Sequence, residues 1–139
     1  MKIVTKNFLL GLTASLALMA GGAQAATVVG TYGIGTADGV VTSPPGGGGY
    51  GYISTVNGVA GAGQIASVGG TNGSSWTSDG FAANAGDILS FNFNYVTSDG
   101  AGYADYAFAE LLDGAMNSLG YLFTARTTTS GDTSPGFGL

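Results

Sequence analysis

The stretch Leu89–Ala109 reads LSFNFNYVTSDGAGYADYAFA, and its first seven residues carry the clearest structural pattern in the chain. Apolar side chains alternate there with polar ones, the apolar set being Leu89, Phe91, Phe93 and Tyr95. A period of two places these side chains on one face of an extended chain. Residues 89–95 are therefore predicted to form a half-buried strand, with on the order of 8 kcal/mol of gross apolar burial.

The run that follows, Tyr103–Leu112, combines two conflicting signals. Its alanines, leucines and glutamate are good helix formers. Its large side chains nevertheless alternate with alanine, as in a strand buried on both faces, and this alternation favours a strand. Asp113-Gly114 then signals a turn before a second apolar run, Leu119–Ala125, so the two runs are predicted to form a hairpin.

Upstream of this stretch the chain is rich in glycine and in short β-prone runs. Thr27–Gly30 and Tyr50–Val59 are predicted strands, whereas Ser43–Gly49 (SPPGGGG) is predicted to be a loop. Residues 26–139 are expected to form one Gly-rich all-β domain, an antiparallel, jelly-roll-like β-sandwich. About five usable strands leave sheet edges open, so this sandwich is expected to be truncated and incomplete.

The first residues have the features of a secretory signal. Two lysines precede an apolar run, Phe8–Met19, which is followed by a small-residue A-x-A motif, Ala23–Ala25. Residues 1–25 are therefore predicted to be a signal peptide that is cleaved between Ala25 and Ala26. The apolar run is shorter than the roughly 20 residues that span a bilayer, which argues against an uncleaved anchor. No membrane span is expected after cleavage.

Cleavage would change the charge balance strongly, because both lysines lie in the signal. Arg126 remains as the one basic residue against eight acidic ones, a net charge near −7. So acidic a chain is not expected to bind nucleic acid or anionic lipid. The sequence contains no Cys and no His, which excludes thiol chemistry, the usual zinc sites and His-based acid–base catalysis.

The loop between the two predicted central strands concentrates acids and glycines. Asp99 and Asp105, with the hydroxyl of Ser98, are candidate ligands for a calcium ion, because Ca²⁺ prefers oxygen ligands. The alternative is a tight turn in which Asp99-Gly100 sets the geometry and Asp105 binds backbone amides. Paired carboxylates for glycoside hydrolysis have no supporting His, Arg or Lys nearby, so no enzymatic activity is predicted.

Exposed aromatic side chains are the other candidate binding groups. Trp76, the single tryptophan, either caps one end of the core or stacks on a sugar ring. Tyr103, in the acidic loop, is a second candidate for sugar stacking, as are Tyr50 and Tyr52. These residues would make the chain a carbohydrate-binding module that recognises extracellular polysaccharide.

The run Phe93–Ala107 (FNYVTSDGAGYADYA) resembles a family of secreted bacterial proteins that end in a PEP-CTERM tail read by an exosortase. Three further runs fit the same pattern: Tyr50–Thr55, Gly69–Ser74 and Phe123–Thr128. The resemblance covers most of residues 38–139.

The resemblance implies an extracellular β-sandwich that is sorted to the envelope or exopolysaccharide matrix of a Gram-negative bacterium. It brings no catalytic residues and no cofactor. This chain has no Pro-Glu-Pro motif, no C-terminal apolar span and no terminal basic cluster. Release into the periplasm, cell surface or medium is therefore the expected fate. The predicted function is that of a non-enzymatic, matrix-associated protein, with a carbohydrate-binding module as the alternative.

Overall fold

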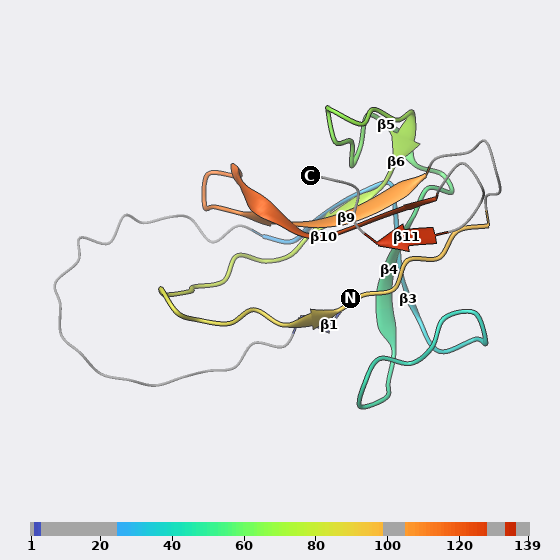
Figure 1. Ribbon diagram of the computed structural model, residues 1–139, viewed down its shortest axis with the longest axis horizontal. Coiled ribbons are helices and arrows are strands. Elements are labelled where there is room, and N and C mark those ends of the chain that lie inside the picture. The colour runs from blue at the N-terminus through green and yellow to red at the C-terminus, as the bar shows by residue number, and fades with distance from the viewer. Residues whose placement is uncertain (1, 4–24, 99–104, 128–132, 136–139) are drawn as a thin grey trace, which may run out of the picture.

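The computed structural model describes residues 2–3, 25–98, 105–127 and 133–135 (Figure 1). In these ranges the chain forms strands and turns without a helix, and every strand pairing is antiparallel. The predicted all-β class is therefore confirmed, whereas the sandwich arrangement stays a prediction. A search of the same residues finds no helix that is long and apolar enough to cross a bilayer.

Within the described ranges, eleven strands build five small sheets. The strands are β1 (Lys2–Ile3), β2 (Thr27–Val29), β3 (Thr31–Gly35), β4 (Tyr50–Ser54), β5 (Val59–Ala60), β6 (Asn72–Gly73), β7 (Ser75–Thr77), β8 (Phe91–Asn92), β9 (Tyr106–Leu112), β10 (Ser118–Thr127) and β11 (Thr133–Pro135). The largest sheet has the order β11-β10-β9, and the others are the pairs β2–β7, β3–β4, β5–β6 and β1–β8.

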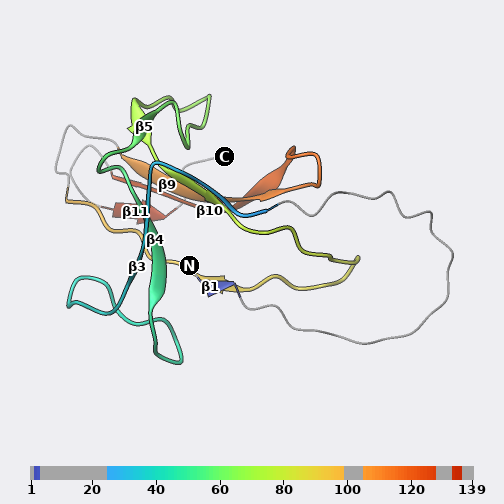
Figure 2. The same ribbon diagram turned by 180° about the vertical axis from the view of Figure 1, so that it is seen from behind.

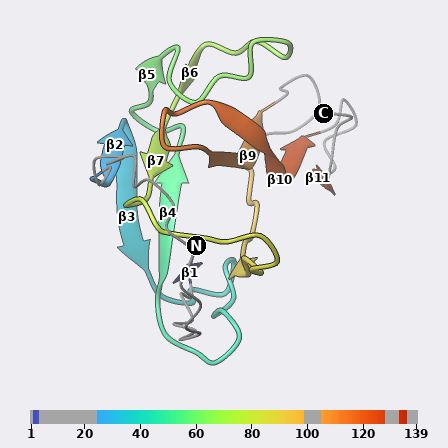
Figure 3. The same cartoon turned by 90° about the vertical axis from the view of Figure 1, so that its left-hand side faces the viewer.

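The sheets fall into two groups in space. Figures 1 and 2 show the β9–β10 hairpin lying across the β3–β4 pair. Figure 3 shows β2, β3, β4 and β7 gathered on one side, with β10 and β11 on the other. Strand β3 contacts both β2 and β7, so the two pairs form one neighbourhood.

The β9–β10 hairpin confirms the predicted pairing of the two apolar runs on either side of Asp113-Gly114. Its register runs from Leu112 opposite Ser118 to Tyr106 opposite Arg126. Strand β10 is longer than β9 because the register shifts twice, as in β-bulges. The predicted turn begins at Asp113, and the left-handed residue of this turn is Met116, with φ of 67°. The helix alternative for this run is thereby excluded within Tyr106–Leu112.

The β3–β4 pair shows why a glycine-rich run forms a strand. Gly33 lies opposite Tyr52, and Gly35 lies opposite Tyr50. A Cβ atom on Gly33 would lie 2.5 Å from the Tyr52 ring, and one on Gly35 would lie 2.7 Å from the Tyr50 ring. Each tyrosine ring therefore rests directly on the backbone of the opposite strand, which a larger residue would prevent.

The prediction of a strand over residues 89–95 is wrong in extent. Only Phe91–Asn92 is a strand, and it pairs with Lys2–Ile3, inside the predicted signal. Phe93 is 54% exposed, although its ring lies 3.6 Å from that of Phe123, centroid to centroid. Side-chain alternation requires only an extended segment with one face on a sheet. It does not require a ladder of backbone hydrogen bonds.

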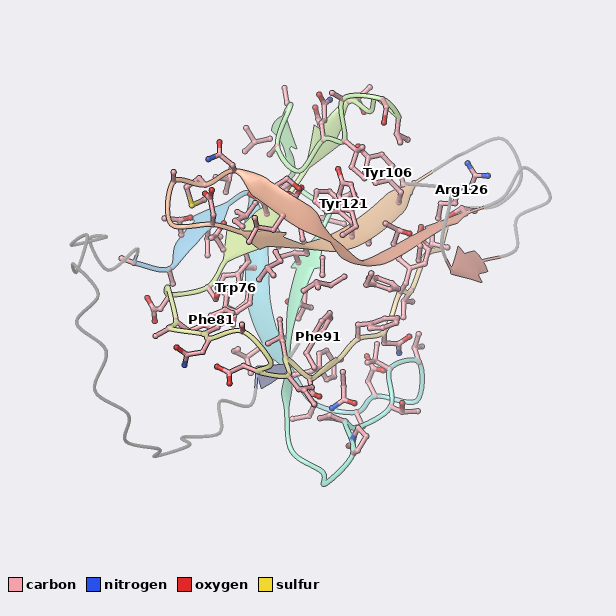
Figure 4. All side chains as sticks on the ribbon, turned by 60° about the vertical axis from the view of Figure 1, so that its left-hand side comes forward. Trp76, Phe81, Phe91, Tyr106, Tyr121 and Arg126 are labelled. Carbon is pink, nitrogen blue, oxygen red and sulfur yellow. The ribbon has the colours of Figure 1, made fainter. Side chains whose placement is uncertain are left out.

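The core of the described residues is small. Its buried apolar side chains are Ile65, 4% exposed, and Ala125, 3% exposed, next to the buried hydroxyl of Thr127. The Tyr106 hydroxyl accepts the Ile65 N–H at 2.9 Å and donates to the Gly69 carbonyl at 2.6 Å. Figure 4 shows Tyr106 reaching from β9 toward the part of the chain around β5 and β6. The Tyr106 hydroxyl thus links the turn that begins at Ile65 to the β9–β10 hairpin, the central hairpin of the fold.

Candidate functional site

The acidic loop is described only at its base. Asp99 and Tyr103 lie outside the described residues. The Asp105 carbonyl accepts the Tyr95 hydroxyl and the Thr127 N–H, both at 2.9 Å. The Tyr95 hydroxyl also lies 3.0 Å from Thr127 Oγ1. These contacts close the loop through the backbone of Asp105, and both the calcium site and the tight turn stay predictions.

Four other carboxylates bind backbone amides. Asp38 accepts the N–H groups of Val40 and Val41, each at 2.9 Å. The remaining acceptors of this kind are Asp79, Asp87 and Asp113. Backbone hydrogen bonds from Val41 and then Val40 lower the pKa of Asp38, because they favour its charged form. Among the described residues no cluster of three His, Cys, Asp or Glu side chains forms a metal-binding group.

Asp113 organises the turn of the central hairpin. Its Oδ1 atom accepts the N–H groups of Ala115 and Asn117, each at 2.8 Å, and its Oδ2 atom accepts Asn117 Nδ2 at 3.0 Å. The side-chain hydrogen bond from Asn117 is the main cause that lowers the pKa of Asp113, followed by the backbone N–H of Asn117. The carboxylate therefore acts as a cap for the turn.

This cap makes the hairpin sensitive to acid. Because its folded pKa is lowered from 3.8, the Asp113 carboxylate stabilises the fold above about pH 4 and loses this effect as the pH falls through the folded pKa. We expect the melting temperature to fall between pH 5 and pH 2, and to fall less in Asp113→Asn. Asn117→Ala removes the side-chain hydrogen bond that is the main cause of the lowered pKa of Asp113. It should therefore make the melting temperature less dependent on pH in the same way. Parallel profiles for wild type and Asp113→Asn would contradict the cap.

Trp76 is neither a fully buried core residue nor a free platform. It lies opposite Val28 in the β2–β7 ladder and is half-buried. Its ring stacks on that of Tyr32, with ring centroids 5.9 Å apart and ring planes inclined by 16°. The position of Trp76 is shown in Figure 4. One face of the indole is thus occupied by a neighbouring ring.

Tyr50 and Tyr52 form a second aromatic pair, on one face of β4. Their ring centroids lie 6.5 Å apart with the planes inclined by 58°, and Tyr52 is 44% exposed. Gly33 and Gly35 support these rings from below. Desolvation, followed by the negative charge of Asp38, raises the pKa of Tyr50. Two partly exposed rings within the electrostatic influence of the Asp38 carboxylate make this pair the most complete candidate binding surface among the described residues.

In the sequence, Tyr50 and Tyr52 are candidates for sugar stacking that rank behind Trp76 and Tyr103. The overlooked signal is the facing pattern of TYGIG and YGYIS, in which glycines lie opposite tyrosines. No protein-family model matches the chain, and no significant match was found among curated proteins or solved structures. The function must therefore be inferred from the chemistry of the residues themselves.

Proposed function

We propose that the chain is a secreted, non-enzymatic protein of the envelope or exopolysaccharide matrix of a Gram-negative bacterium. The features of residues 1–25 support export, and the resemblance carried by Phe93–Ala107 supports the matrix. The proposal assigns no catalytic role to any side chain.

A two-stranded ribbon with apolar groups on both faces carries this proposal. On one face of the β3–β4 pair, Ile34 is 71% exposed and Ile53 is 43% exposed. On the other face, Tyr52 is 44% exposed. Exposed apolar patches on proteins are typical of surfaces that contact other molecules. Such a ribbon suits a protein that works by association.

Sedimentation with exopolysaccharide tests the proposal. We expect the protein exported from the full chain to sediment with the polysaccharide of its host. The double variant Ile34→Thr, Ile53→Thr keeps β-branched residues on the ribbon and should reduce the bound fraction several-fold. An exposed pair elsewhere, Leu119→Thr and Leu122→Thr on β10, is the matched control and should bind as wild type. Equal binding by both double variants would contradict a role for the ribbon, and no sedimentation at all would contradict matrix association.

Carbohydrate binding is the second candidate, and the Tyr50–Tyr52 pair favours it. Sugars present apolar C–H faces that pack on aromatic rings, while their hydroxyls need polar acceptors. The 58° inclination of the rings suits a single glycan chain that turns along its length better than a flat crystalline surface. Asp38, whose charge acts on Tyr50, is the expected acceptor for a sugar hydroxyl.

Loss of one ring should weaken glycan binding measurably. We expect Tyr52→Ala to raise the Kd for purified exopolysaccharide by about two- to tenfold, since an aromatic contact contributes roughly 0.5–1.5 kcal/mol. Tyr52→Phe keeps the ring and should bind within about twofold of wild type. Isothermal titration calorimetry measures both, and Tyr121→Ala on β10 is the control for loss of an exposed tyrosine. Equal affinity of Tyr52→Ala and wild type would exclude this pair as the site.

A further inference from the structure

The start of β2 is held by a carboxylate from a distant part of the chain. The backbone N–H of Ala26 donates to Asp79 Oδ1 at 2.7 Å, across 53 residues of sequence. The β2–β7 ladder, which begins with Thr27 opposite Thr77, brings the two together. Ala26 and Asp79 therefore lie just beyond the same end of this ladder, and both are exposed.

Ala26 is also the residue at which the A-x-A motif predicts the mature chain to begin. Hydrolysis of the Ala25–Ala26 peptide bond adds the water oxygen to the Ala25 carbonyl carbon, which becomes a carboxylate. The Ala26 nitrogen gains protons and becomes an α-ammonium group, because an α-amino group has a pKa of about 7.7–8.0. The nitrogen that now donates to Asp79 as part of an uncharged amide would then carry a positive charge.

We infer that the Asp79 carboxylate binds the new N-terminus, so that removal of the signal converts this hydrogen bond into an ion pair. The hydrogen bond to the carboxylate would then gain the Coulomb attraction between two opposite charges. The free end of a short terminal strand otherwise tends to fray. After processing, the ion pair would hold β2 more strongly to β7, the strand that carries Trp76. This inference rests on the export of the chain proposed above.

The described residues of the strands around this pairing bring few other titratable groups to it. Strands β2 and β7 contribute no titratable side chain. Asp87, the other carboxylate of the segment after β7, accepts the N–H of Asn84 at 2.7 Å. Tyr32 of β3 packs its ring on Trp76. Beyond the signal, Arg126 would be the one other cation in the chain, so the α-ammonium would supply one of two positive charges against eight acids.

The loss of both lysines with the signal makes a selective experiment available. The exported protein would contain a single primary amine, the α-amine of Ala26, so an amine-selective acetylating reagent removes its charge without modifying a lysine. The intact mass of the exported protein is measured first and establishes where it begins. The pKa of the amine is then obtained from the pH dependence of its acetylation rate, in wild type and in Asp79→Asn.

We expect a higher amine pKa in wild type than in Asp79→Asn, because the carboxylate favours the charged form. A raised folded pKa stabilises the fold below about pH 8, and this effect is lost as the pH rises through the folded value. Acetylation should accordingly lower the wild-type melting temperature at pH 7 by roughly 2–4 °C, and that of Asp79→Asn by much less.

Asp87→Asn is the matched control, and its response to acetylation should equal that of wild type. The same amine pKa in wild type and Asp79→Asn, or the same acetylation effect, would overturn the ion pair while leaving export intact. A measured mass that shows a first residue other than Ala26 would overturn the inference, because the predicted cleavage site would be wrong. A chain that is not exported at all would contradict the proposed function itself, so the failures are distinguishable.

Discussion

Tyr106→Phe is expected to lower the free energy of unfolding by about 1–3 kcal/mol, the cost of leaving two part-buried backbone groups without their partner. The lost hydroxyl accepts the Ile65 N–H and donates to the Gly69 carbonyl. Ile65 is one of the few buried apolar residues in the described part of the chain, so its turn contributes much of the core. Urea denaturation followed by circular dichroism measures the change as a shift of the midpoint.

Tyr121→Phe is the control for this substitution. Tyr121 lies on the neighbouring strand β10 and is 38% exposed, so water replaces any partner that its hydroxyl loses. Its free energy of unfolding should stay within about 0.5 kcal/mol of wild type. Equal effects of the two substitutions would contradict the role of Tyr106 as the anchor of the Ile65 turn.

Gly30→Ala is expected to be more damaging still, at about 3 kcal/mol. Gly30 has φ of 78°, a left-handed conformation that costs other residues about 1–2 kcal/mol. A Cβ atom there would also overlap the Ser74 hydroxyl, and relief of such overpacking costs about 1–3 kcal/mol. That hydroxyl accepts the Thr31 N–H at 2.8 Å and donates to the Ser54 carbonyl at 2.6 Å, so its displacement would break the link from Ser74, between β6 and β7, to strands β3 and β4.

Gly39→Ala separates the cost of the left-handed backbone from the cost of steric overlap. Gly39 has φ of 92°, but a Cβ atom there would meet no other atom within 4 Å. Its cost should be limited to the backbone, about 1–2 kcal/mol. Thermal unfolding of the two variants should differ clearly, with Gly30→Ala the less stable. Indistinguishable melting temperatures would show that Ser74 does not join the strands.

The sequence predicted the central hairpin well because its signals are local. The alternation in residues 106–112, the turn at Asp113-Gly114 and the apolar run after it all agree, and the β9–β10 pairing confirms them. The segment 89–95 failed because its alternation reflects packing of Phe93 on Phe123 rather than strand pairing. Strand β3 was not predicted, since its glycines gain a role only from the tyrosines opposite them.

The candidate site was less accessible from the sequence than the fold. Which aromatic ring is exposed depends on what lies across the sheet: Trp76 has Tyr32 on one face, whereas Tyr52 rests on Gly33 and keeps its outer side exposed. Asp105 binds its neighbours through its carbonyl, which no residue type reveals. The Asp79 contact with Ala26 depends on the β2–β7 register and has no signal in the sequence.

The residue at which the exported chain begins is the most direct test of the proposed secretion. The full 139-residue chain would be produced in a Gram-negative host, and the intact mass determined in cytoplasm, periplasm and medium. A chain that begins at Ala26 in the periplasm or medium is predicted. Ala25→Leu, which removes a small residue from the A-x-A motif, should retain the signal. A chain that begins at Met1 and stays in the cytoplasm would contradict secretion, matrix association and the Asp79 ion pair together.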